Sequence, residues 1–199
     1  MMKISPTFCS IKLFLLLLSS NSFAQQRYDI PKGYQVYIGG DGETRQIEAD
    51  FDHDGIKDAF ALFKDKKENL IAALFLSNVH AASKNYYYLP LERAIEYSLN
   101  LKGNVVNLGS CVGTGRFCKT LKFRYDSKIN DLRLIGYDEE ARGNAMHDGA
   151  YTKSINLLTG KYEIVDSNTK KKKTKSGTFQ VFSIKNMYDS IFDYLVSVD

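Results

Sequence analysis

The sequence predicts a mostly β protein (β-rich α+β): a single domain with an antiparallel sheet or meander and a C-terminal amphipathic helix. Most of the chain consists of short stretches in which apolar and polar residues alternate, separated by residues typical of turns. No internal repeat or proline-rich linker divides these stretches. The apolar spacing becomes that of a helix only near the end of the chain, which places the predicted helix there.

The first 24 residues have the features of a signal peptide. Lys3 and Lys12 supply positive charge, 13–18 is an uninterrupted apolar run, and Ser22 and Ala24 are small residues of the kind found at cleavage sites. The run is far shorter than the roughly 20 residues that span a bilayer, and no later stretch reaches that length. Cys9 precedes the run, which is not where a lipid-carrying cysteine would lie. We expect cleavage after Ala24, a periplasmic or secreted protein, and no membrane span.

Removing this segment from the 199 residues leaves 25–199, which is enough for one well-buried β-rich domain. The 27 basic and 23 acidic residues of the whole chain nearly balance, so the composition does not indicate a nucleic-acid partner. Positive charge is concentrated in the run TKKKKTKSG at 169–177. We interpret it as a solvated hairpin loop, with contact to an anionic surface or a phosphate as the alternative.

Hairpins account for most of the predicted domain. Their turns contain glycine, asparagine, aspartate and lysine, and 119–138 shows the apolar alternation of a strand pair with one buried face. The predicted hairpins are 34–51, turning at Gly39, Gly40 and Gly42; 59–77, turning at 65–69; 98–110, turning at 102–104; 119–138; and 154–166, turning at Thr159 and Gly160. A last strand is predicted at 177–184.

Two segments have helical spacing. Near the C-terminus, Met187, Ile191, Leu195 and Val198 fall on one helical face, which predicts an amphipathic helix that covers the sheet. The segment 90–99 is ambiguous, because a proline can open a helix and apolar residues then recur every four positions. Helix and strand both remain open for that segment.

The stretch DFDHDGIKD at 50–58 crowds four carboxylates into nine residues. Neighbouring carboxylates repel, and a hard cation that prefers oxygen ligands reverses that repulsion. Gly55 supplies the backbone freedom that a sharp turn requires. Calcium is favoured over magnesium because a site rich in protein oxygens supplies six or seven ligands. The candidate ligands are the side chains of Asp50, Asp52, Asp54 and Asp58 and the main-chain carbonyl of Ile56; the alternative is a solvated turn without an ion.

This stretch resembles the D-x-D-x-D-G-x-x-D calcium loop of FG-GAP and integrin-alpha-type repeats, which joins two strands. An EF-hand is excluded, since Ala61 stands where a bidentate glutamate is required. One copy of the loop cannot build the multi-blade propeller of those families. Together with 122–138 and 154–164, the chain also resembles uncharacterised exported bacterial proteins that carry one such loop. That resemblance implies a compact antiparallel β domain and no known activity.

Cys111 and Cys118 remain after removal of the signal peptide. In an exported chain a close pair around a glycine-containing turn predicts a disulfide. The alternative, a metal or redox pair, would favour tighter spacing and further ligands nearby.

The candidates for catalysis or partner binding lie in the polar segment 137–151. It contains Arg142, His147 and Asp148, which could contact a partner or form a hydrolase site, or belong to an ordinary exposed loop. The chain has no G-x-S-x-G, H-E-x-x-H or Walker pattern. We therefore expect a non-enzymatic, calcium-binding interaction module with an unidentified protein or glycan partner. The alternatives are an inhibitor or immunity-type partner of a secreted toxin, and a hydrolase.

Overall fold

The computed structural model describes residues 30–77, 89–91, 94, 96–113 and 116–184. Across these residues the chain forms strands, turns and loops and contains no α-helix, in agreement with the β-rich prediction. No helix long and apolar enough to cross a bilayer occurs in this part of the chain. The predicted signal peptide and C-terminal helix lie outside the described residues.

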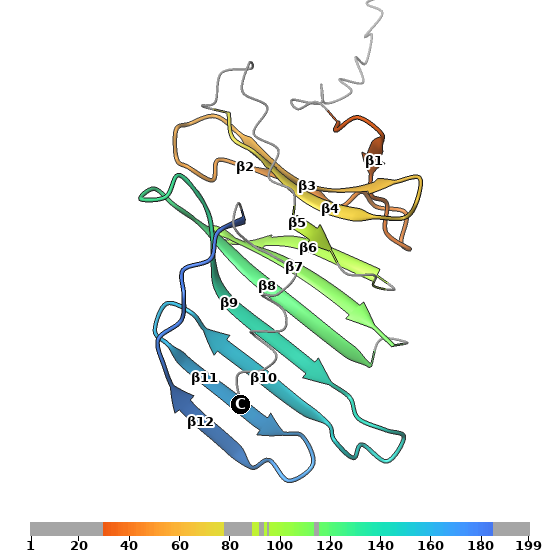
Figure 1. Ribbon diagram of the computed structural model, residues 1–199, viewed down its shortest axis with the longest axis vertical. Helices are drawn as coiled ribbons and strands as arrows, with labels where there is room; N and C mark the ends of the chain where they lie inside the picture. Colours follow the sequence, from red (N-terminus) through yellow and green to blue (C-terminus); the bar gives the residue numbers. More distant parts are fainter. Residues whose placement is uncertain (1–29, 78–88, 92–93, 95, 114–115, 185–199) are drawn as a thin grey trace, which may run out of the picture.

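The strands form two antiparallel sheets (Figure 1). In the second sheet every strand pairs with its neighbour in sequence, so this sheet is a seven-stranded meander, as predicted. The first sheet contains β1 (Tyr34–Val36), β2 (Gln46–Ala49), β3 (Asp58–Asp65), β4 (Leu70–Phe75) and β5 (Leu89–Leu91). The meander contains β6 (Glu96–Lys102), β7 (Val105–Val112), β8 (Phe117–Asp126), β9 (Asp131–Ala141), β10 (Tyr151–Asn156), β11 (Lys161–Asp166) and β12 (Lys172–Ser176).

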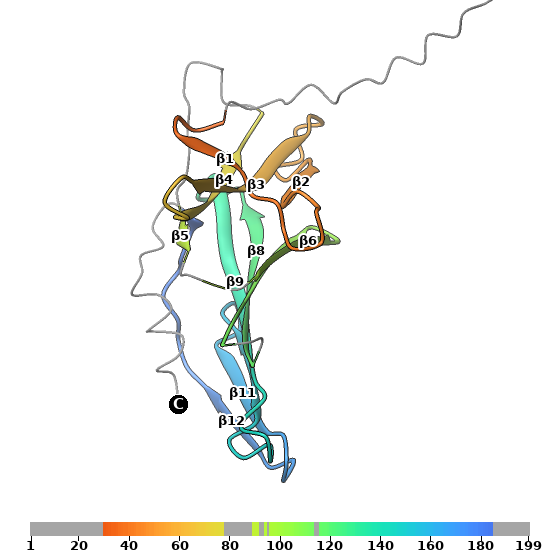
Figure 2. The same ribbon diagram turned by 90° about the vertical axis from the view of Figure 1, so that its right-hand side faces the viewer.

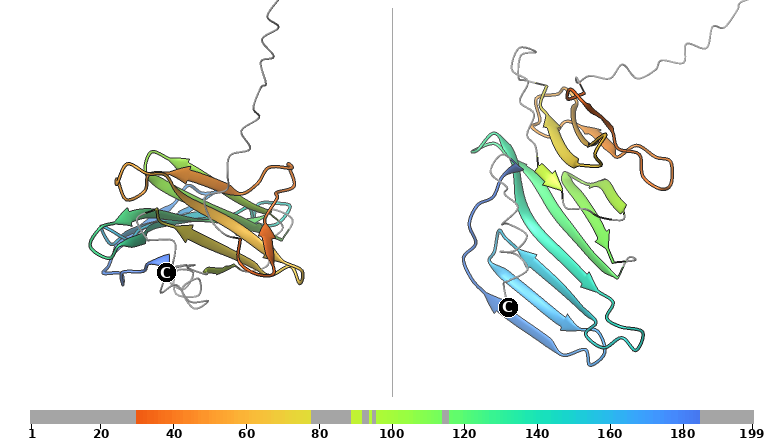
Figure 3. Two further views of the ribbon diagram at one scale, coloured as in Figure 1. Left: turned by 90° about the horizontal axis from the view of Figure 1, so that it is seen from above. Right: turned by 45° about the vertical axis from the view of Figure 1, so that its right-hand side comes forward.

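The first sheet packs over one end of the meander, and β10, β11 and β12 extend beyond it (Figures 2 and 3). The main core lies between the two sheets. Phe60 on β3 faces Phe123 on β8, with 6.3 Å between the ring centroids. The other buried members from the two sheets include Leu62, Leu74, Val106, Leu108, Leu121, Leu132, Leu134 and Tyr137.

β3 and β4 are buried on both faces. Ala61, Phe63 and Ala73 point away from the main core and belong to a second buried cluster. Successive side chains of a strand point to opposite faces, so a strand buried on both sides carries a continuous apolar run rather than an alternating one. This explains why the sequences of β3 and β4 lack the alternation seen in the meander.

The predicted hairpin at 34–51 is confirmed at its glycine turn, where Ile38 and Thr44 form an isolated antiparallel bridge, but not in the strands that flank it. β1 and β2 do not pair with each other; both pair with the same edge of β3, opposite the edge that β4 occupies. Leu62 lies at their junction, where its N–H donates to the Arg45 carbonyl and its carbonyl accepts the Tyr37 N–H. The glycines form a protruding loop that interrupts one edge strand.

A buried arginine fixes this loop to the meander. The Arg45 Nε donates to the Tyr97 carbonyl at 2.7 Å, and Nη2 forms ion pairs with Asp41 at 3.0 Å and Glu96 at 3.2 Å. The hydrogen bond with Asp41 is the main cause that raises the pKa of Arg45. A side chain at Gly39 would collide with the guanidinium, which is why this turn needs a glycine there.

The ambiguous segment 90–99 contains strand rather than helix where it is described. Pro90 lies in β5 and pairs with Ile71, and Leu99 lies in β6 opposite Leu108. A spacing of four residues fits a strand as well as a helix, because every second residue of a strand shares one face. The i, i+4 pattern therefore could not distinguish the two.

The last predicted strand is also misplaced. The lysine run, predicted as a hairpin loop, contributes β12, which pairs with β11. Residues 177–184 form only an isolated bridge between Ser183 and Arg133. Their apolar side chains Phe182 and Ile184 are nevertheless buried in the main core. The apolar residues of this segment therefore reflect burial in the core rather than a strand.

The remaining predicted hairpins are confirmed: β3–β4, β6–β7, β8–β9 and β10–β11. Gly103 in the β6–β7 turn and Gly160 in the β10–β11 turn have φ values of 62° and 71°. Both values lie in the left-handed region that glycine adopts without strain.

Candidate metal centre

The acidic loop connects β2 to β3, and its own carboxylates hold its backbone. The Asp54 N–H donates to Asp50 Oδ1 at 3.0 Å and to Asp52 Oδ1 at 3.2 Å, and the Gly55 N–H donates to Asp50 Oδ2 at 3.0 Å. His53 and Gly55 have φ values of 64° and 88°. This tight turn folds the first two aspartates back toward the start of β3.

Three carboxylates meet at this point. Asp50, Asp52 and Asp58 each offer an oxygen, and these oxygens all lie within 4.8 Å of one another. Asp58 is the buried member, with only 2% of its surface exposed. Its carboxylate accepts the N–H groups of Phe51 and Ser77, both at 2.8 Å. Backbone N–H groups from two sides therefore hold the Asp58 carboxylate in one position at the buried end of the group.

Electrostatic repulsion within the group is visible at Asp52. Burial raises the pKa of its carboxyl, and the nearby Asp58 raises it further. A raised folded-state pKa means that the charged form of Asp52 disfavours the fold. This cost is absent below the ordinary value of 3.8 and develops as the pH rises through the folded-state pKa. A bound cation would offset it at neutral pH.

Asp54, the fourth predicted carboxylate, is not a member of the three-carboxylate group. The Asp54 carboxylate accepts the Ser77 hydroxyl at 3.0 Å and the Ile56 N–H at 2.7 Å. The structure thus brings together three of the four carboxylates predicted from the sequence. Through Ser77, which follows β4, both Asp54 and Asp58 also tie the loop to the next strand.

The β8–β9 hairpin of the meander lies at the same end of the molecule as the acidic loop (Figure 1). Tyr125 is within electrostatic reach of the group: burial raises its pKa most, followed by Asp52 and Asp58. Asp131, which also raises that pKa, is fully buried and accepts the Leu132 N–H at 2.8 Å. Sequence reasoning missed Tyr125, because only the packing of the two sheets brings it near the acidic loop, and it missed Asp131, because an aspartate after a turn is ordinary in a hairpin.

The donor set of the group fits a hard divalent cation. All three residues offer oxygen, and none offers the sulfur or imidazole ligands that zinc and copper favour. The residues Asp50, Asp52 and Asp58 can therefore hold a metal ion.

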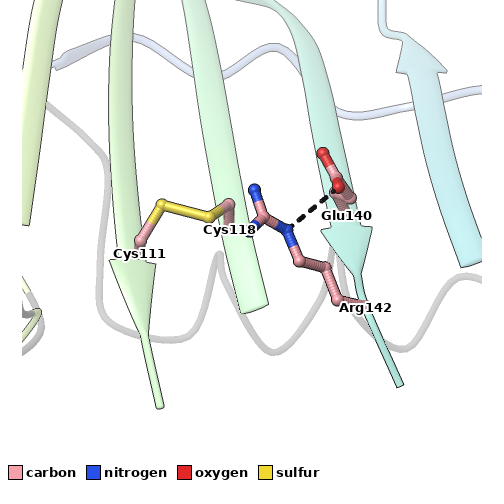
Figure 4. The surroundings of a disulfide bond; sticks show 4 residues. All are labelled: Cys111, Cys118, Glu140 and Arg142. Carbon is pink, nitrogen blue, oxygen red and sulfur yellow. Dashed lines mark hydrogen bonds and ion pairs between the residues drawn. A yellow bond between two sulfur atoms is a disulfide. The ribbon is translucent and has the colours of Figure 1, made fainter. Parts of the chain in front are cut away.

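The two cysteines are joined, as predicted. Cys111 on β7 lies directly opposite Cys118 on β8, and a disulfide connects them across the two strands. Figure 4 shows the bridge beside Glu140 and Arg142, whose Nε and carboxylate oxygen are 3.4 Å apart. Because the strands are already paired around a short turn, the bridge reinforces a local connection rather than joining distant parts of the chain.

The predicted polar segment 137–151 is shorter as a loop than expected, since β9 continues to Ala141. The loop that follows is closed on itself: Asn144 Oδ1 accepts the N–H groups of Met146 and Asp148 at 2.8 and 2.9 Å. The His147 carbonyl accepts the Asn168 side-chain amide at 2.7 Å. Within the described residues the His147 imidazole makes no hydrogen bond or ion pair. Arg142, His147 and Asp148 thus lie in one loop whose backbone is held by its own hydrogen bonds.

A buried polar cluster on the inner face of the meander was not found from the sequence. Glu139 is 3% exposed and accepts the hydroxyls of Tyr137 and Tyr151. In the strand register it lies between Lys119 on β8 and Lys153 on β10, which are also buried. The period-two alternation of β9 would have located Glu139, had the segment been assigned to a strand.

No protein-family model, curated protein or solved structure matches the chain.

The disulfide should stabilise the fold measurably. Cys111→Ser, paired with Cys118→Ser so that no free thiol remains, should lower the free energy of unfolding by about 2–3 kcal/mol in the chain-entropy account of a short closed loop. Denaturant unfolding of the purified protein measures this difference. Free labelling of both thiols in the native wild type would contradict the bridge.

Asp52→Asn should stabilise the metal-free protein at neutral pH by about 1 kcal/mol, because it removes one charge from a repelling group. Urea unfolding in the presence of a chelator measures the change. Asp126→Asn is the matched control with the opposite sign. The pKa of Asp126 is lowered, first by the Lys128 N–H and then by Arg133, so neutralising it should destabilise the fold. A destabilising Asp52→Asn would contradict the repulsion.

Proposed function

We propose that this chain is an exported calcium-binding protein, periplasmic or secreted, that acts as a non-enzymatic binding module. The observation that carries the proposal is the three-carboxylate group of Asp50, Asp52 and Asp58, held by backbone N–H groups at the junction of two strands. Folding has gathered three like charges there, and a divalent cation offsets the resulting repulsion.

Calcium is the proposed ion because the loop offers many protein oxygens in a short span. Calcium takes six to eight oxygen ligands, whereas magnesium keeps several of its waters. In this proposal Asp54 and the Ile56 carbonyl complete the shell around the three carboxylates. The resemblance of the loop to the FG-GAP type supports the same ion and the same strand-loop-strand setting.

The proposed role of the ion is structural. The loop is tied to the residue after β4 through Ser77, and it lies near Tyr125 of the other sheet. A cation at this position stiffens the junction where the two sheets meet, without taking part in a reaction. The disulfide on the outer face of β7 and β8 is consistent with an oxidising compartment, as the signal-like N-terminus indicates.

An inhibitor or immunity-type partner of a secreted toxin is the second candidate. The observation that favours it is Met146, which is 80% exposed at the tip of the ordered loop that carries Arg142, His147 and Asp148. An exposed methionine on a fixed loop is well suited to contact another protein. Stoichiometric recovery of one enzyme with the mature protein from a periplasmic extract would favour this candidate.

Calcium should stabilise the mature protein. With a Kd of ~10⁻⁴ M, ~1 mM calcium contributes about 1.4 kcal/mol, which raises the melting temperature by about 4 °C. Asp50→Asn should remove most of this response. Thermal melts with calcium, magnesium and chelator, together with calorimetric titration, measure it.

Asp65→Asn provides the matched control. Asp65 closes the β3–β4 turn by accepting the N–H groups of Lys67 and Asn69, so it has the same local role without belonging to the three-carboxylate group. The control variant should keep the full calcium response. Identical melts in calcium and chelator, with no binding heat, would mean that the acidic loop is a solvated turn.

A further inference from the structure

The last strand of the meander, β12, has an unusual composition for a sheet edge. Lysine occupies five of the seven positions from 170 to 176, and all five residues of β12 are exposed. β12 pairs only with β11, so its other edge carries no strand among the described residues. An exposed edge of this kind presents unpaired backbone donors and acceptors.

The hydrogen-bond pattern identifies which residues face the free edge. The Asp166 N–H donates to the Lys171 carbonyl, and the Gly177 N–H donates to the Gly160 carbonyl. Along an antiparallel pair of strands, residue pairs that are hydrogen-bonded to each other alternate with pairs that are not. Lys173 and Lys175 therefore also bond toward β11, while the N–H and carbonyl groups of the residues between them point outward. The outward set is Lys172, Thr174 and Ser176.

The lysines occupy both faces of this edge. Lys173 lies opposite Ile164 on the inner face, and Lys172 reaches Glu163 on the outer face at 2.5 Å. A second copy of β12 aligned on the edge would place lysine against lysine, and this repulsion opposes self-pairing. An acidic strand in the same place reverses the sign of the interaction. The edge thus discriminates between partners by charge while offering the same backbone bonds.

We propose that β12 binds an acidic, extended segment of a partner protein, which adds to the meander as an eighth strand. Main-chain bonds to Lys172, Thr174 and Ser176 would supply the pairing, and the flanking lysines would select carboxylate side chains. The inference rests on the proposed role of the chain as a binding module, and it does not depend on the ion. β12 and the acidic loop lie toward opposite ends of the long axis of the molecule (Figure 1).

The test is a titration of the mature protein with a synthetic peptide of about ten residues that alternates glutamate and valine, long enough for one strand. A second peptide of identical sequence carries N-methyl groups on alternate amides, which blocks strand pairing and preserves charge. The parent peptide should bind at least tenfold more tightly than the methylated one. Equal binding by the two peptides would overturn the inference.

A backbone variant tests the edge itself. Thr174→Pro removes an N–H that points to the free edge and is not used in the ladder with β11, a position where a strand tolerates proline. It should weaken peptide binding at least tenfold, while Thr174→Val keeps the N–H and should bind as the wild type does. Unchanged affinity in a folded Thr174→Pro protein would overturn the proposal.

Amide hydrogen exchange on the wild type gives a readout that does not depend on the folding of any variant. Bound peptide should slow exchange at Lys172, Thr174 and Ser176 more than at Lys173 and Lys175, which already bond to β11. Uniform or absent protection across β12 would contradict strand addition.

Two further arms separate this proposal from its alternatives. Vesicles of phosphatidylglycerol test a lipid surface as the alternative partner. If Thr174→Pro leaves vesicle binding unchanged and the peptide does not slow amide exchange in β12, the partner is a membrane and not a strand. Repeating the peptide titration in calcium and in chelator separates the two functional claims. Peptide binding without a calcium response would retain this inference and reject the ion, and the reverse result would reject this inference alone.

Discussion

The packing of β3 against the inner face of the meander is the interaction on which the rest of the structure depends. Phe60 and Leu62 of β3 lie in the main core with Phe123 of β8, and they help to cover the apolar face of the meander at that end. Both faces of β3 are buried, so its register is fixed by apolar contacts on two sides. A shift of one residue would exchange Phe60 and Leu62 with Ala59, Ala61 and Phe63 between the two clusters.

That fixed register determines where the acidic loop lies. Asp58 is the first residue of β3, so its carboxylate is placed by the strand rather than by the loop. Asp50 directly follows β2, whose pairing with β3 brings the two ends of the loop together. The remaining carboxylates then accept N–H groups within the turn. The backbone thus brings the carboxylates of the acidic loop together although they repel one another. The packing of the core offsets the free-energy cost of this repulsion.

The sequence predicted the parts of the fold that depend on local patterns. Period-two alternation and turn residues located the meander hairpins, and the two-residue spacing of aspartates located a site from which Asp50, Asp52 and Asp58 converge. It could not predict the shared edge of β3, because strand pairing depends on contacts between distant residues. Tyr125 was missed for the same reason: only the stacking of the two sheets brings it near the loop.

Terbium luminescence tests the central claim, a cation held by Asp50, Asp52 and Asp58 beside the β8–β9 hairpin. Terbium occupies calcium sites and emits when a nearby tyrosine absorbs light, and Tyr125 lies within electrostatic reach of the group. Tyrosine-sensitised emission should appear, excess calcium should abolish it, and Tyr125→Phe should strongly reduce it. Absence of sensitised emission, or emission that survives both excess calcium and the Asp50→Asn substitution, would contradict a metal centre in this loop.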